Sequence, residues 1–194
     1  MNYANLITFD SANGPGWRVS LFVSGCDFHC PGCFNEEAQD RKYGQIFTAE
    51  TRQIIEGALC DPRISGLSLL GGDPLCQEVD SLSELVELAH TAHRFGKDVW
   101  LWSGFTWEDV FADRPEELPV HKLRKALVKL SDIFVDGQFM ISQRDTALAF
   151  KGSSNQRIID VQKSLAAGEV VLWSEVPGQI SIEEYMKETH YENN

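Results

Sequence analysis

The chain has 194 residues, of which 43% are hydrophobic and 24% charged, a balance typical of a single folded domain. Its formal net charge of -12 repels phosphate backbones, so we expect no nucleic-acid partner. No stretch approaches the roughly 20 apolar residues that span a bilayer. The first residues also lack a secretory signal, so we expect a cytoplasmic protein without membrane contact.

In the first half of the chain, apolar runs with strand character alternate with segments of helical period. The first predicted strand covers residues 17–23, and the second covers residues 66–72. Between them, Thr48 is placed to cap a helix that ends near Leu59. After the second strand, Ser81 and Glu84 match a capping box for a further helix.

The second half continues the same alternation. Strands are predicted at residues 98–102, 132–135, 157–161 and 169–173, with helical segments near 107–112, 120–130 and 161–167. This order indicates an α/β fold with a mainly parallel sheet. The units are too few for eight repeats, so we expect a partial, incomplete β/α barrel. Residues 1–175 would form one domain, and residues 176–194 a polar C-terminal tail.

Three of the five cysteines stand close together, directly after the first predicted strand. Cys26, Cys30 and Cys33 lie within the segment SGCDFHCPGCFN, residues 24–35. Thiolates are soft ligands that suit zinc or an iron–sulfur cluster. A cubane cluster is normally held by four cysteines, so three would leave one iron open to a further ligand, as catalytic metals require.

Two other interpretations of the cysteines stay open from the residues alone. A structural zinc site could be completed by His29, Cys60 or Cys76. Cys60 has the pattern of a small buried apolar residue, which makes Cys76 the stronger candidate for a fourth ligand. An electron-transfer ferredoxin is the other interpretation, but it normally needs four ligands in one recognisable run.

Further candidate residues stand where later strands end, which is where α/β sheets place their chemistry. Gly71 and Gly72 lack a Cβ, so a ligand could approach their backbone, although a plain tight turn would also explain them. Ser103 and Asp136 end the next strands and could contact a ligand. Asp136-Gly137 is equally an ordinary turn signal.

Several motifs in this order resemble the radical S-adenosylmethionine superfamily, whose hallmark is the cysteine spacing C-x3-C-x2-C. Within it, the chain is similar to the activating proteins of anaerobic ribonucleoside-triphosphate reductases. The matching stretches are NGPGWRVSLFVSGCDFHCPGCFN (13–35), GLSLLGGDPL (66–75), DVWLWSGFTWEDV (98–110), DIFVDGQF (132–139) and KGSSNQRIIDV (151–161).

The resemblance implies a [4Fe-4S] cluster on Cys26, Cys30 and Cys33 that binds S-adenosyl-L-methionine and cleaves it reductively. The resulting 5′-deoxyadenosyl radical would take hydrogen from a glycine of the anaerobic ribonucleoside-triphosphate reductase, leaving a glycyl radical on that partner. An external electron donor such as flavodoxin is implied, and no acid–base residue is required. Another glycyl-radical enzyme or a small molecule is the alternative substrate.

The resemblance also implies a set of cofactor contacts. Gly32 replaces an aromatic residue common in the superfamily, and Asp73 replaces a glutamate common in the glycine-rich turn. The role of the motif at residues 152–157 is left unassigned. The implied cofactor-binding residues are Gly32, Phe34, Gly71, Gly72, Asp73, Ser103 and Asp136.

Overall fold

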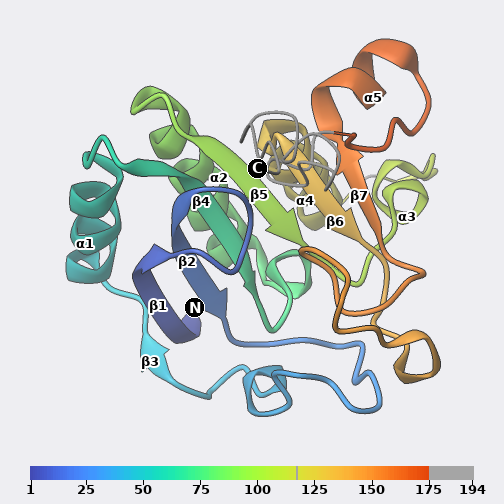
Figure 1. Cartoon of the computed structure of the whole chain (residues 1–194), viewed down its shortest axis with the longest axis horizontal. Coiled ribbons are helices and arrows are strands. Elements are labelled where there is room, and N and C mark those ends of the chain that lie inside the picture. Colours follow the sequence, from blue (N-terminus) through green and yellow to red (C-terminus); the bar gives the residue numbers. More distant parts are fainter. Residues whose placement is uncertain (117, 175–194) are drawn as a thin grey trace, which may run out of the picture.

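A computed structural model describes residues 1–116 and 118–174 of the chain. Within these residues, seven strands form one open sheet in the order β3-β1-β2-β4-β5-β6-β7 (Figure 1). The strands are β1 (Asn2–Asp10), β2 (Trp17–Val23), β3 (Gln45–Ile46), β4 (Ile64–Gly71), β5 (Asp98–Trp102), β6 (Ile133–Asp136) and β7 (Arg157–Asp160).

The centre of the sheet is parallel, and its two margins are antiparallel. Strands β2, β4, β5 and β6 run parallel to one another. Strand β1 is antiparallel to β2 and to β3, and β7 is antiparallel to β6. The predicted α/β class with a mainly parallel sheet is therefore confirmed, while the edge strands β3 and β7 do not pair to close a barrel.

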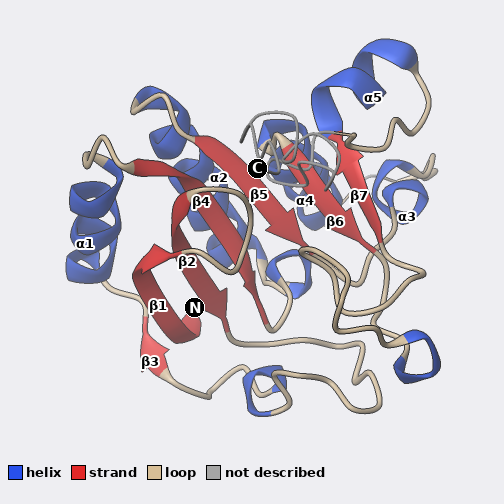
Figure 2. Cartoon of the chain, in the orientation of Figure 1, coloured by secondary structure: helices blue, strands red, loops and turns tan. Residues whose placement is uncertain are grey.

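Helices cover one face of the sheet (Figure 2). Their apolar side chains pack onto the alternate strand residues that point to that face, including Leu21, Leu69 and Leu101. Burial of this amphipathic stripe, more than helix propensity, stabilises such helices. The described helices are α1 (Ala49–Leu59), α2 (Val79–Arg94), α3 (Trp107–Phe111), α4 (Pro119–Leu130) and α5 (Val161–Ala167), of which α1, α2 and α4 supply most of this packing.

Loops cover the opposite face, which is polar and aromatic. Arg18 is fully buried there; its Nε donates to Ser68 Oγ at 2.6 Å, and its guanidinium pairs with Asp98 at 2.5 Å. Next to it, the Trp100 ring contacts the rings of Phe150 and Trp173. This face has no helical layer among the described residues, and the carboxyl ends of its strands lead into loops.

Several predicted boundaries were wrong. The capping box at Ser81 does not form, because α2 already begins at Val79 after Glu78. Residues 169–173 contain no strand, only an isolated bridge between Leu172 and Ile159. Strand β1 was not predicted at all. The expected tail at residues 176–194 lies outside the described residues, and no described helix has the length and hydrophobicity to span a bilayer.

Candidate metal centre

The cysteine loop begins where β2 ends and is fixed to the neighbouring strand ends by backbone hydrogen bonds. Gly25 N donates to Ala38 O at 2.7 Å, and Cys26 N donates to Gln39 O at 3.1 Å. From the other side, Asp73 N donates to Gly25 O at 2.9 Å. The first cysteine of the motif is therefore held in place by its own backbone and by the turn that follows β4.

All three motif cysteines line one open cavity of about 490 Å³. The carboxyl ends of the parallel strands meet there, as expected for an α/β sheet. A loop spanning residues 137–156 forms the facing wall. The predicted residues that line this cavity are Cys26, Cys30, Cys33, Gly32, Phe34, Gly71, Gly72, Asp73 and Ser103.

The glycine pair is required by the chain's own backbone. Gly71 has φ +111°, and a Cβ on it would stand 2.6 Å from Val23 N. A Cβ on Gly72 would stand 2.6 Å from Ala38 O and 2.7 Å from Gly25 O. The expected close approach is present, but the groups that approach are the end of β2 at Gly71 and the cysteine loop at Gly72. Both glycines also border the cavity, so their contact with a cofactor stays a prediction.

Asp73 is a fully buried carboxylate at the base of the cavity. Its Oδ1 accepts from Leu75 N at 2.7 Å and Cys76 N at 3.3 Å, and its Oδ2 accepts from Gly104 N at 2.7 Å. The Ser103 hydroxyl lies 2.9 Å from both oxygens. Burial raises the pKa of Asp73 to about 6, against the lowering effect of these hydrogen bonds. The carboxylate thus joins the ends of β4 and β5.

Asp136 has a different environment from the other predicted residues. It is fully buried but does not line the cavity, whereas the adjacent Gly137 does. Strand β7 runs antiparallel and places Arg157 directly opposite it. The guanidinium contacts both carboxylate oxygens, at 3.0 and 2.5 Å, and Trp107 N donates to Oδ2 at 2.8 Å. A cofactor contact by Asp136 therefore stays a prediction that the observed contacts do not support.

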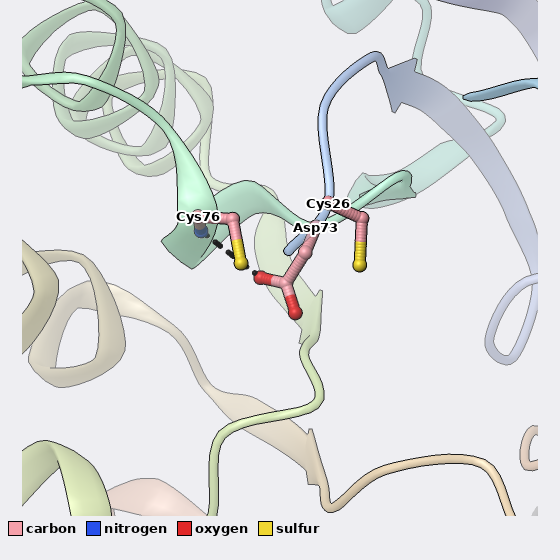
Figure 3. A group of neighbouring side chains, drawn as sticks. All are labelled: Cys26, Asp73 and Cys76. Carbon is pink, nitrogen blue, oxygen red and sulfur yellow. Dashed lines mark hydrogen bonds between the residues drawn. The ribbon is translucent and has the colours of Figure 1, made fainter. Parts of the chain in front are cut away.

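The first motif cysteine has a second thiol beside it. Ligand atoms of Cys26, Asp73 and Cys76 all lie within 4.8 Å of one another (Figure 3). Interaction with the Cys76 thiol lowers the pKa of Cys26. The same contact is the main cause that raises the pKa of Cys76, and burial of Cys76 raises it further. Cys26 is therefore the member of the pair that becomes a thiolate more readily, as a metal ligand must.

The donor set fits an iron–sulfur cluster. Burial raises the pKa of Cys30, and the negative charges of Cys26 and Cys33 raise it further, so the three sulfurs act on one another. They do not form a group within 4.8 Å among the described residues. A single zinc ion binds each sulfur at about 2.3 Å, so its sulfur ligands must lie closer to one another than 4.8 Å. A cubane spreads its ligands over different irons, which suits the wider spacing.

The other candidate ligands are less suitable. His29 is exposed, and its Nδ1 lies 2.9 Å from Gln39 Oε1, within the same loop. Cys60 is exposed at the end of α1, so the expectation that it is buried was wrong, and it does not line the cavity. Cys76 is buried beside Cys26 and remains the one rival ligand that the described residues offer.

Comparison with known proteins places the chain in a family. Residues 12–159 match the protein family described as "4Fe-4S single cluster domain". The anaerobic ribonucleoside-triphosphate reductase-activating protein of Salmonella typhi is 42% identical over 159 residues, which cover 80% of this chain and 96% of that protein. The chain belongs to this family of activating proteins.

Other members of the family are similarly related to the chain. The protein of the same name from Escherichia coli strain K12 is 39% identical over 80% of this chain and 96% of its own length. That of Enterobacteria phage T4 is 36% identical over 81% of this chain and 93% of its own length. The relatives are therefore matched over almost their whole length, and the range that matches the 4Fe-4S family, residues 12–159, includes all three motif cysteines.

In this family member, the motif at residues 152–157 builds the facing wall of the cavity. Gln156 Oε1 accepts from Gly152 N at 2.8 Å, and its Nε2 donates to Gly137 O at 2.9 Å. Asn155 Nδ2 donates to Gln138 O at 2.8 Å. These side chains connect the two ends of the loop. The sequence singled out the motif, but only the structure shows that it shapes the cavity.

Proposed function

We propose that the chain is a radical S-adenosylmethionine enzyme, with an incomplete barrel of that type, which activates an anaerobic ribonucleoside-triphosphate reductase. A [4Fe-4S] cluster would supply one electron that splits S-adenosylmethionine into methionine and a 5′-deoxyadenosyl radical, which takes a hydrogen atom from a glycine Cα of the reductase. The products are 5′-deoxyadenosine and a glycyl radical on the partner.

One observation carries this proposal: three thiols, and no suitably spaced fourth in their motif, face one open cavity at the carboxyl edge of the sheet. Its volume of about 490 Å³ falls within the roughly 300–1,000 Å³ of small-molecule sites. Cys26, Cys30 and Cys33 would hold the cluster, while Phe34 and the loop at residues 137–156 would border the bound cofactor.

The remaining lining residues support a positioning role. Asp73 and Ser103 hold the ends of β4 and β5 together, so the base of the cavity has a fixed shape. The ring of Phe28, which also lines the cavity, packs edge to face on the ring of Phe105 with the ring centroids 5.0 Å apart. These groups would exclude water and orient the substrate, since the difficult chemistry belongs to the cofactor.

We further propose an external electron donor such as flavodoxin, and a cytoplasmic location. The five cysteines include no second run that could hold a relay cluster. The partner reductase would reach the cavity from its open side, where Phe34 is 95% exposed.

The proposal is tested by anaerobic reconstitution with iron and sulfide, followed by reduction and addition of S-adenosylmethionine. We expect formation of 5′-deoxyadenosine, measured by liquid chromatography, and its loss in Cys33→Ala. The matched control is Cys60→Ala, whose thiol is exposed and outside the cavity. A colourless, zinc-loaded protein without cleavage would contradict the proposal.

Two further measurements separate the alternatives. Adding an anaerobic ribonucleoside-triphosphate reductase should give a glycyl radical signal by electron paramagnetic resonance; cleavage without that signal would point to another substrate. Cys76→Ala should keep its full iron and sulfide content. Loss of the cluster in Cys76→Ala would show that Cys76 is the fourth ligand and that no iron is open to S-adenosylmethionine.

A further inference from the structure

The proposed function leaves one thiol at the site without a role. Cys76 ends the short helix η2 (Pro74–Cys76) and is 4% exposed. Its sulfur lies within 4.8 Å of the Cys26 sulfur, and Figure 3 shows the side chains of both cysteines beside that of Asp73. A buried thiol next to a metal-binding thiol, outside the cysteine motif, calls for a physical explanation.

Two side chains of the protein, Gln77 and Arg41, hold the segments that carry these thiols together, independently of any cluster. The buried side chain of Gln77 donates from Nε2 to Ser24 O at 3.1 Å and to Gly25 O at 3.2 Å. On the other side, Arg41 donates to Cys76 O at 2.9 Å and pairs with Asp27 at 2.6 Å. The segments that carry the two cysteines are thus joined by two side-chain bridges, so removal of a cluster leaves the pair in place.

We propose that Cys26 and Cys76 form a disulfide in the cluster-free protein, and that this bond closes the cluster site until a reductant opens it. A disulfide needs the sulfurs about 2.0 Å apart, so the two side chains must rotate to close a gap that is at most 4.8 Å. The Cys26 and Cys76 sulfurs already lie within 4.8 Å of one another, and the bridges through Gln77 and Arg41 hold them there, which favours Cys76 as the partner of Cys26.

The oxidant in this reaction is a small-molecule disulfide such as oxidised glutathione. The Cys26 thiolate attacks one of its sulfurs, forms a mixed disulfide and releases one glutathione thiolate. Cys76 then loses its proton and attacks the Cys26 sulfur, releasing the second glutathione thiolate. The chain loses two electrons, the oxidant gains them, and the two released thiolates take up the protons.

This bond would have two consequences for the site. Only Cys30 and Cys33 of the motif would remain as ligands, so iron and sulfide could not rebuild the cluster. Cys26 would also be protected from irreversible oxidation to sulfinic acid. The first consequence rests on the proposed function, because it assumes that Cys26 is a cluster ligand, whereas formation of the disulfide does not.

The test begins with cluster-free, fully reduced protein treated anaerobically with oxidised glutathione. Non-reducing digestion and mass spectrometry should find the Cys26 peptide joined to the Cys76 peptide as its main oxidised form. Cys76→Ser should instead retain a glutathione adduct on Cys26, because nothing resolves it. Cys60→Ser is the control and should give the same Cys26–Cys76 link as the natural chain. If Cys26 is joined to Cys30 or Cys33, or keeps its adduct in the natural chain, the proposal is wrong.

A second measurement tests closure of the site. After oxidation, iron and sulfide should restore the visible absorbance of the cluster only when a dithiol such as dithiothreitol is added first. Full cluster uptake by the cross-linked protein without a dithiol would overturn the proposed closure. Failure of the proposed function is distinguishable, since a chain that does not cleave S-adenosylmethionine could still give the mapped disulfide.

Discussion

Two buried aspartates stand at the ends of parallel strands, and the chain uses them in opposite ways. Asp73 follows β4 and is surrounded by neutral donors from backbone amides and the Ser103 hydroxyl. Asp136 ends β6 and is paired with the Arg157 guanidinium. The same residue type at equivalent strand ends is therefore a wall of the cavity in one case and an ion-pair partner outside it in the other.

The difference follows from the neighbouring strand. Next to β4, strand β5 is parallel, so two strand ends and their loops meet around Asp73. Next to β6, strand β7 is antiparallel and presents Arg157 at the position directly across from Asp136. In this chain, the carboxylate at the strand end with a parallel neighbour, Asp73, borders the cavity. The carboxylate at the strand end with an antiparallel neighbour, Asp136, is instead paired with the arginine opposite it.

Of the substitutions that distinguish Asp73 from Asp136, Asp73→Ala should have the largest effect on stability. This substitution leaves four donors without an acceptor, each costing about 1–3 kcal/mol, so the free energy of unfolding should fall by roughly 4 kcal/mol or more. Urea unfolding of the cluster-free, reduced protein measures this loss. Ser103→Ala removes one donor only and should cost about 1 kcal/mol. Equal losses in the two variants would contradict the shared hydrogen-bond network.

Asp136→Ala should have a smaller effect, although its carboxylate is equally buried. Arg157 keeps a second partner, because it also pairs with Glu108 at 2.6 Å, and its side chain is 32% exposed. We expect the free energy of unfolding to fall by about 2 kcal/mol, less than the 3–5 kcal/mol for breaking a fully buried pair. Asp136→Asn should recover part of it through Trp107 N. If Asp136→Ala lowered the free energy of unfolding more than Asp73→Ala does, Asp136 would be the more important of the two aspartates for stability, contrary to this prediction.

The pH dependence of the free energy of unfolding should show that the Asp73 carboxylate, unlike that of Asp136, has no cation beside it. The folded-state pKa of Asp73, about 6, lies above its ordinary value of 3.8, so between these values the folded state binds the extra proton. Stability gained from this proton is present below pH 4 and is lost as the pH rises through about 6. Relative to Asp73→Asn, the natural chain should therefore gain about 1 kcal/mol between pH 7 and pH 5.

Other groups titrate in the same experiment, so at each pH the free energy of unfolding of Asp73→Asn is subtracted from that of the natural chain. The contributions of the other groups cancel in this difference. Arg63 lowers the pKa of Asp61 to about 2, and the stability from this pair is lost only as the pH falls from about 4 towards 2. A difference that stays constant from pH 7 to pH 5 would show that Asp73 is ionised throughout.

Glu108→Gln should have the smallest effect. The Glu108 side chain is 61% exposed and contacts Arg157 from the solvent side. Exposed ion pairs contribute about 0–1 kcal/mol, so we expect a loss below roughly 0.5 kcal/mol. Thermal unfolding of the natural chain and the variant measures it. A loss as large as that of Asp136→Ala would mean that Glu108, and not Asp136, is the main partner of Arg157.

Local signals in the sequence predicted local structure well. Thr48 caps α1 as expected, and its hydroxyl accepts from Thr51 N at 3.3 Å. Strand β1 escaped prediction because its residues, NYANLITFD, show no regular alternation of apolar and polar side chains. The box at Ser81 and Glu84 failed because α2 already begins at Val79, so Ser81 lies inside the helix and not at its N-cap.

The part of the site that lies within the cysteine motif could be predicted from the sequence, but its contacts with other segments could not. The positions of Cys26, Cys30 and Cys33 follow from their spacing after a strand, whereas the contact between Cys26 and Cys76 depends on the register of β2 with β4. That register places Val23 beside Gly71 and so brings the two following turns together. The pairing of Asp136 depends likewise on strand direction, which a single sequence does not encode locally.

The distribution of the cavity's walls along the chain has a consequence for the order of folding. Cys33, Gly72, Ser103 and Gln156 all border it, and they are separated by tens of residues. Contacts over such separations form late, since long loops must close first. In zinc fingers, by contrast, metal binding itself drives folding. Here the sheet must assemble first, so the cluster should be inserted into a chain that has already folded.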